Sequence, residues 1–358
     1  MSATEYAVKN YTSEQVPAVI SRDSSAVLKG VGILVVLISH YLSFYIYEDN
    51  PVSGVANVTV SVFFILSGYG VFSSLRKRLK NKLGTKAIFI FYKDRLLKII
   101  PLLWISLCLQ FLITGNTFPA TAFFGYELTG HYWFISSILQ CYLLSPFLFL
   151  IIEAGKYCSL GSVTLGMMLL ASLERDSSVF EPLLMGFHLA ESPYLQIYFL
   201  HTYLFFCGMC LHHFGYWFEH KRILSKALFC SRRLVFWLLL FAALTYTCLE
   251  KAVFSGLPLL GSLCLFFLTC AYALQNHVAS ESIAIKAVKF IGNHSLPIYL
   301  FHMSYYFLLE RLGLLSTNPI VGISFTITLL PVFVSVSTLL ETFVDFFYKK
   351  LQNLGCTT

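Results

Sequence analysis

The stretch KGVGILVVLISH, residues 29–40, places a lysine and a histidine at the two ends of ten uncharged, mostly apolar residues. Eleven steps along an α-helix turn by about 1100°, roughly 20° past three full turns, so Lys29 and His40 are expected on one helix face. Their separation along the axis would be about 16 Å. If this helix crosses a bilayer, Lys29 lies at one surface and His40 lies well inside the membrane.

The composition of the whole chain is that of a membrane protein. Of its 358 residues, 57% are hydrophobic and 12% are charged, about half of the roughly 25% charged residues in soluble domains. Apolar runs of about 20 residues recur without the alternation of barrel strands, and lipid requires every backbone group to be paired within the span. The sequence therefore predicts an all-α, polytopic transmembrane helix bundle.

Basic residues in the loops predict the orientation of this bundle. Residues 76–98 contain nine lysines and arginines and a single acid, Asp94. The positive-inside rule makes this segment cytoplasmic. Residues 218–233 form a second basic loop, whereas residues 173–193 are acidic and are expected outside. A chain with about ten spans and both termini in the cytoplasm satisfies all of these preferences.

The predicted boundaries follow from the apolar runs. The ten spans are expected at residues 26–47, 55–75, 99–113, 131–152, 158–172, 194–214, 234–250, 254–274, 290–310 and 319–343. They form one transmembrane domain over residues 26–345, between a cytoplasmic N-terminal tail (residues 1–25) and a cytoplasmic C-terminal tail (residues 346–358).

A histidine in mid-membrane is costly, and it indicates function unless it hydrogen-bonds a neighbouring helix. His40 is the first candidate, and His188, His201 and His302 compete with it. Glu48 and Asp49 could orient His40 only if the first span bends. The other histidines lie near predicted span ends or in loops, where solvation accounts for them; these are His131, His212, His213, His220, His277 and His294.

Three cations are expected at the cytoplasmic mouth of the bundle. Arg95 and Lys98 are three residues apart and so share a helix face, and Lys29 begins the first span. Together they suit a phosphate-bearing cytoplasmic ligand. The alternative for each is an interfacial anchor, the common role of lysine and arginine at span ends.

Two other groups of residues favour structural roles. Cys207 and Cys210 in CGMCLHH have metal-like spacing, but no further ligand set accompanies them and the motif is not CxxCH, so no metal is expected. Most of the ten cysteines are expected to be small buried apolar residues. The small residues of SGYG, residues 67–70, favour close helix packing.

At this point the motifs resemble a family, the acyltransferase family 3 membrane proteins, which include O-acetyltransferases of bacterial surface polysaccharides. Five motifs carry the resemblance in order: Lys29 and His40 with ten residues between them, FFILSGYGV (63–71), YKDRLLKIIP (92–101), HYWFISSILQCYLLSP (131–146) and IGNHSLPIYLFH (291–302). The resemblance implies that His40 is the catalytic histidine. It also implies that Lys29, Arg95 and Lys98 lie at the acyl-donor site, with Lys29 and Lys98 in places where arginine is common.

The sequence with this resemblance predicts an integral-membrane acyltransferase of the cell membrane, the inner or plasma membrane in a bacterium. It would move an acyl group, expected to be acetyl from cytoplasmic acetyl-CoA, to a hydroxyl of an envelope glycan or lipid-linked sugar. His40 would act as general base or through an acyl-imidazole, and both routes remain open. Some relatives carry an extracytoplasmic esterase-like domain, so this chain is expected to act alone or with a separate extracytoplasmic partner; no nucleic acid is expected.

A transporter or exporter of a glycan or small metabolite is the alternative from another class. Ten spans, intramembrane histidines and a basic inner face would also suit that function. The sequence lacks an inverted repeat or paired broken helices, which transporters often have.

Overall fold

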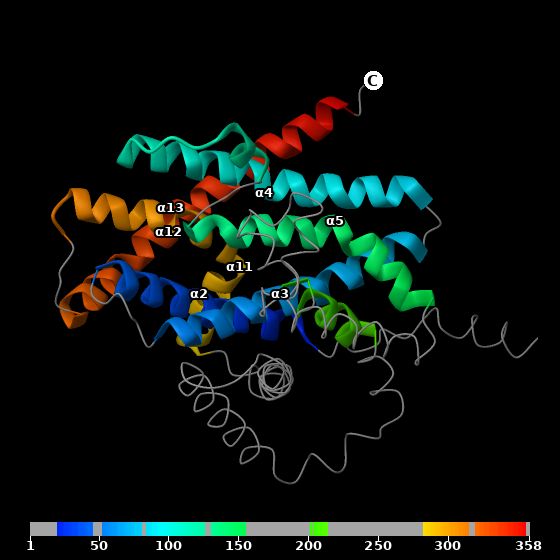
Figure 1. Ribbon diagram of the computed structural model, residues 1–358, viewed down its shortest axis with the longest axis horizontal. Coiled ribbons are helices and arrows are strands. Elements are labelled where there is room, and N and C mark those ends of the chain that lie inside the picture. Colours follow the sequence, from blue (N-terminus) through cyan, green and yellow to red (C-terminus); the bar gives the residue numbers. More distant parts are fainter. Residues whose placement is uncertain are drawn as a thin grey trace, which may run out of the picture.

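The computed structural model describes residues 20–45, 52–80, 84–125, 130–154, 201–202, 204–213, 282–314 and 319–355. Within these ranges the chain is helical and has no strand, which confirms the all-α class. The elements are α2 (Arg22–Tyr45), α3 (Val52–Lys80), α4 (Gly84–Thr114), η1 (Ala120–Phe124), η2 (Gly130–Tyr132), α5 (Trp133–Ala154), α11 (Ile283–Asn293), α12 (Ser295–Arg311) and α13 (Pro319–Gly355). Figure 1 shows α2, α3, α4 and α5 along the long axis of the molecule, with α13 crossing them obliquely.

Five helices in the described part are long and apolar enough to cross a membrane. They contain the segments Arg22–Ser43, Thr59–Leu79, Gly84–Thr114, Trp133–Glu153 and Thr328–Tyr348, which correspond to the first four predicted spans and the tenth. A shorter apolar helix, Leu204–His213, lies in the sixth predicted span. The predicted spans at 158–172, 234–250 and 254–274 lie outside the described residues, so the count of ten and the side of each terminus stay predictions.

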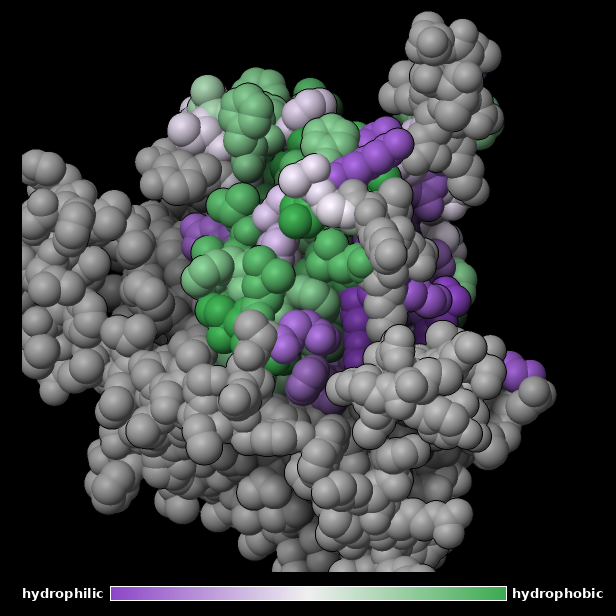
Figure 2. All heavy atoms as spheres, turned by 90° about the vertical axis from the view of Figure 1, so that its right-hand side faces the viewer, coloured by the Kyte–Doolittle hydropathy of each residue, from purple (hydrophilic) through white to green (hydrophobic). Residues whose placement is uncertain are grey.

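Exposed apolar side chains show which helix faces would meet lipid. On α5, Leu143, Phe147 and Leu150 are exposed, and their spacing of four and three residues places them on one stripe of the helix. On α13, Val336, Leu339 and several phenylalanines that follow are also exposed. Figure 2 shows hydrophobic side chains over much of one side of the described surface. Such faces are stable against a hydrocarbon environment and not against water.

The basic segment 76–98, predicted as a loop, is mostly helical. α3 continues to Lys80 and α4 already begins at Gly84, so the loop prediction was wrong for most of its length. Lysine and arginine are good helix formers, and a charged helix end is stable in water. An ion pair between Arg78 Nη2 and Asp94 Oδ2, 2.6 Å apart, ties the two helix ends together.

The predicted ninth span, residues 290–310, is not one helix. α11 ends at Asn293 and α12 starts at Ser295, with His294 between them. Pro297 favours this break, because it has no N–H for the carbonyl of Asn293 and its ring crowds that carbonyl. The following helix is a buried one: from Pro297 to Ser304 every residue of α12 is buried.

Backbone contacts through glycines hold α2 against α11. A Cβ atom at Gly292 would overlap the backbone of Ala26, and one at Gly30 would overlap the backbone of Val288. Ala26 and Gly30 are four residues apart on α2, a small-xxx-small arrangement that lets helices approach closely. The crossing lies directly beside Lys29, so it fixes the position of that end of α2.

The packing role predicted for residues 67–70 is confirmed for Gly68. A Cβ atom there would overlap the carbonyl of Phe205, and one at Gly208 would overlap the carbonyl of Ile65. α3 and the helix Leu204–His213 therefore meet through two glycines. Gly70 faces open space, so it takes no part in this contact.

Candidate functional site

His40 of α2 lies against a second histidine, His302 of α12. His40 Nδ1 and His302 Nε2 are 2.7 Å apart, while the ring centroids are 4.9 Å apart and the ring planes differ by 9°. Stacked rings cannot bring heavy atoms this close, so the rings meet edge to edge in nearly one plane. This is the geometry in which a lone pair on one nitrogen points at an N–H of the other ring.

His302 also has a second partner on its own helix. Its Nδ1 is hydrogen-bonded to the carbonyl oxygen of Tyr299, and its side chain is completely buried. The sequence predicts His40 and His302 as competing candidates, and the structure brings them together into one pair. His188, Glu48 and Asp49 lie outside the described residues.

A third histidine, His131 of η2, completes a histidine cluster of His40, His131 and His302. Its ring centroid is 5.2 Å from that of His302, and its backbone carbonyl accepts a hydrogen bond from the Tyr299 hydroxyl. The residue is 7% exposed, so the prediction that solvation accounts for His131 was wrong. Among the described residues its buried Nε2 has no hydrogen-bond partner, a costly condition for a polar atom.

Hydrogen bonds around the histidine cluster fix α12 against its neighbours. The Tyr306 hydroxyl donates to the carbonyl of Leu37 at 2.8 Å, which ties α12 to α2 one turn before His40. The Ser106 hydroxyl of α4 donates to the carbonyl of Leu300 at 2.6 Å. Because helix backbones accept these bonds, the bonds fix the placement of α12 against α2 and α4.

The three predicted cations gather toward the other end of α2. The charges of both Lys98 and Arg95 act on the Lys29 ammonium, so the three form a cation cluster between α2 and α4. The Arg95 guanidinium also lies over two aromatic rings, 5.7 Å from the centroid of Phe91 and 5.4 Å from that of Tyr142. These distances are within the range of cation–π attraction, so Arg95 is held in place by its aromatic neighbours.

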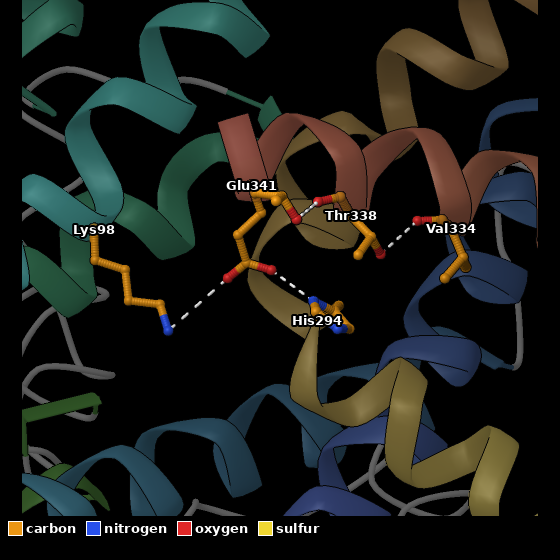
Figure 3. A network of polar contacts seen from close by, with 6 residues as sticks. Lys98, His294, Val334, Thr338 and Glu341 are labelled. Atoms are coloured by element: carbon orange, nitrogen blue, oxygen red, sulfur yellow. Dashed lines mark hydrogen bonds and ion pairs between the residues drawn. The ribbon is translucent and has the colours of Figure 1, made fainter. Parts of the chain in front are cut away.

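A buried carboxylate, Glu341 of α13, joins the cation cluster. Its Oε2 is 2.6 Å from His294 Nδ1, and its Oε1 is 3.9 Å from Lys98 Nζ (Figure 3). Glu341 is 8% exposed, whereas the Lys98 side chain is 55% exposed. Solvation was predicted to account for His294, and that was wrong, because His294 lies against this buried acid.

The sequence predictions missed Glu341, although a signal was present. It is the single acid within the predicted tenth span, residues 319–343, and an ionisable residue inside a membrane helix marks a functional hypothesis by default. Its partners could not be found this way, because His294 is 47 positions away along the chain.

The rings of the remaining described histidines lie against aromatic side chains; these histidines are His201, His212 and His213. The His201 ring is stacked on Phe64, with centroids 4.4 Å apart, and lies 4.9 Å from Trp133. His213 Nδ1 is 3.8 Å from Glu153 Oε1 at the end of α5. Within the described ranges, no group of three histidine, cysteine or acidic side chains is placed to hold a metal ion.

A sequence model of the acyltransferase domain of acyltransferase family 3 matches residues 23–342 of this chain. The match runs from the start of α2 into α13, and it includes the histidine cluster, the cation cluster and Glu341. This chain belongs to acyltransferase family 3. The resemblance predicted from the five motifs is thereby confirmed. Comparisons with curated proteins and with solved structures give no match.

Family and fold together define the class of this acyltransferase family 3 protein. The family has acyltransferase activity, and five helices of the described part have the length and composition of membrane spans. The protein is therefore a multi-pass membrane acyltransferase. The two clusters on α2 are the candidates for its donor site and its reaction centre.

Proposed function

We propose that this membrane acyltransferase moves an acyl group, acetyl in the simplest case, from cytoplasmic acyl-CoA to a hydroxyl of a cell-envelope or exported glycan, or of its lipid-linked precursor. The observation that carries the proposal is the layout of α2. One end of the helix bears Lys29 within the cation cluster, and the other bears His40 within the histidine cluster. A donor with phosphates at one end and a thioester at the other matches this polarity.

The cation cluster supplies the charge that CoA phosphates need. Lys29, Arg95 and Lys98 carry three positive charges, against the single negative charge of Glu341, the carboxylate that lies next to Lys98. The cation cluster together with Glu341 therefore has a net positive charge. Arginine binds phosphate through a planar fork and lysine through a point charge, and both contacts are charge-assisted hydrogen bonds. Phosphates held here would leave the thioester end of the donor free to extend toward His40.

The proposed reaction needs one group that accepts a proton near the thioester. The acceptor hydroxyl attacks the thioester carbonyl, a C–O bond forms and the C–S bond breaks. His40 takes the hydroxyl proton, which then passes to the departing CoA thiolate. In the alternative route, the lone pair of His40 attacks the thioester carbonyl, and the C–S bond breaks to release the thiolate. The hydroxyl then attacks the acyl-imidazole, the C–N bond breaks, and the hydroxyl proton passes to the thiolate. Both routes balance, and both use a lone pair on a His40 nitrogen.

The decisive experiment measures transfer of radiolabelled acetyl from acetyl-CoA by the full chain, purified in detergent or nanodiscs, to envelope glycan from a strain lacking the gene. The wild type is expected to label the glycan, and His40→Ala is expected to abolish labelling at equal levels of folded protein. A matched control is His212→Ala, which removes a histidine outside the histidine cluster and is expected to leave transfer unchanged. Passage of glycan across a membrane without covalent labelling would refute the proposal and favour a transporter.

A further inference from the structure

We infer that His302 is a positioning residue that fixes the tautomer of His40, so that Nε2 of His40 is the nitrogen that exchanges protons during acyl transfer. The inference rests on the proposed function and adds to it a residue and a specific nitrogen. It follows from two hydrogen bonds that the structure places in series, from the Tyr299 carbonyl through His302 to His40.

The first bond determines where His302 carries its proton. A backbone carbonyl can only accept a hydrogen bond, so His302 Nδ1 must be the donor toward Tyr299. His302 is completely buried, and among the described residues no carboxylate pairs with it. An apolar bundle disfavours the charged imidazolium in such a position. A neutral ring protonated on Nδ1 has its lone pair on Nε2.

The second bond then determines the state of His40. His302 Nε2 can only accept, so across the 2.7 Å contact His40 Nδ1 must donate. The neutral His40 ring is therefore protonated on Nδ1, and its lone pair is on Nε2. This is the tautomer in which Nε2 takes the hydroxyl proton or attacks the thioester.

The arrangement also supports the charged state of His40 during the reaction. When Nε2 takes a proton, Nδ1 keeps its own and continues to donate to His302, so no hydrogen bond is lost. Triad enzymes use a carboxylate for this purpose, and an incorrect tautomer there is strongly inhibitory. Here a neutral imidazole does the same without placing a further negative charge inside the bundle, where an unpaired charge is costly.

Two substitutions at His302 separate this role from simple packing. In His302→Gln the side-chain amide lies near the position of Nε2, so its oxygen can still accept from His40 Nδ1. In His302→Asn the amide lies near the position of Nδ1, so it can donate to the Tyr299 carbonyl but cannot reach His40. Both variants replace an imidazole by an uncharged amide, so each serves as the control for the other.

The kinetic test compares kcat and the donor KM of these variants with the wild type. His302→Asn is expected to lower kcat about tenfold to a hundredfold, the loss found when the hydrogen-bond partner that orients a metal-bound histidine is removed. His302→Gln is expected to retain most of kcat, and the KM for acetyl-CoA is expected to stay within about twofold in both. Equal losses in the two variants, or wild-type kcat in His302→Asn, would overturn the inference.

A second readout does not depend on activity. In the full chain labelled with ¹⁵N-histidine, the signals that vanish in His40→Ala belong to His40, and their chemical shifts report which nitrogen carries the proton. The wild type is expected to show protonated Nδ1 and unprotonated Nε2, and His302→Asn is expected to show mixed tautomers. A wild-type His40 protonated on Nε2 would overturn the inference, whereas absence of acetyl transfer with the expected tautomer would count against the proposed function alone.

Discussion

Replacing Arg95 by alanine tests whether the cation cluster binds the acyl donor. The guanidinium lies between the rings of Phe91 and Tyr142, so it is already placed before any ligand arrives. We expect Arg95→Ala to raise the KM for acetyl-CoA while kcat at saturating donor falls much less, because Arg95 is remote from His40 and its contact would be made equally in the ground and transition states.

The size of the effect follows from the contact that is removed. One charge-assisted hydrogen bond contributes about 1.5–3 kcal/mol, and about 1.4 kcal/mol corresponds to tenfold in affinity, so the KM should rise about tenfold to a hundredfold. Arg95→Lys keeps the charge but loses the planar fork and part of the attraction to the two rings, which is worth about 0.5–1 kcal/mol at an exposed site. Its KM should therefore rise by roughly twofold to fivefold.

The assay titrates labelled acetyl-CoA against purified wild type, Arg95→Ala and Arg95→Lys at equal amounts of folded protein. Lys93→Ala is the matched control, because Lys93 is an exposed cation on the same helix. Loss of net positive charge alone would affect Lys93→Ala and Arg95→Ala alike, whereas a donor site affects only the latter. An unchanged KM for acetyl-CoA in Arg95→Ala would refute donor binding by Arg95. Arg95 would then have only the structural role of anchoring α4 through its aromatic contacts.

Three further outcomes follow from the structure. His131→Phe should leave the unfolding temperature in detergent unchanged or raised. Within the described part of the chain, Nε2 of His131 makes no hydrogen bond that the substitution would remove. A marked fall in the unfolding temperature would mean that Nε2 makes a structural hydrogen bond. Gly292→Leu should destabilise the protein by more than the roughly 1–3 kcal/mol of ordinary overpacking, since it meets backbone, while Gly70→Ala has open space and should have little effect; both are read from thermal unfolding. Single cysteines within residues 76–98 should be labelled only from the cytoplasm and those within 173–193 only from outside, in a cysteine-free background; labelling of both from one face would contradict the predicted topology.

The sequence predicted the features that depend only on a short continuous stretch of the chain. Hydrophobic runs placed α2, predicted from residue 26 and found from Arg22, because a helix that crosses lipid needs about 20 apolar residues whatever its neighbours are. The same pattern could not locate the break at His294. Pro297 was visible in the sequence, but proline is tolerated in membrane helices, so its effect there depends on what can satisfy the freed carbonyl.

Contacts between distant residues were beyond such patterns. His40 and His302 are 262 positions apart, and no periodicity relates them. The sequence identified both as costly intramembrane groups, which is a statement about each residue and the solvent. Their pairing, like that of Glu341 with His294, depends on which helices pack together, and that is decided by the whole bundle.

The attachment of α2 at two points fixes the distance between the proposed donor site and His40. α11 contacts the N-terminal half of α2 at Ala26 and Gly30. α12 contacts the C-terminal half of α2 at Leu37 and His40. The distance from Lys29 to His40, about 16 Å along the axis, is thus a property of the backbone. The pantetheine arm of CoA has the same length in every acyl-CoA. A fixed distance from the phosphate site to His40 would therefore suit any acyl-CoA equally, whatever its acyl group. With the proposed CoA donor, a preference for acetyl over longer acyl groups would have to come from side chains beyond His40.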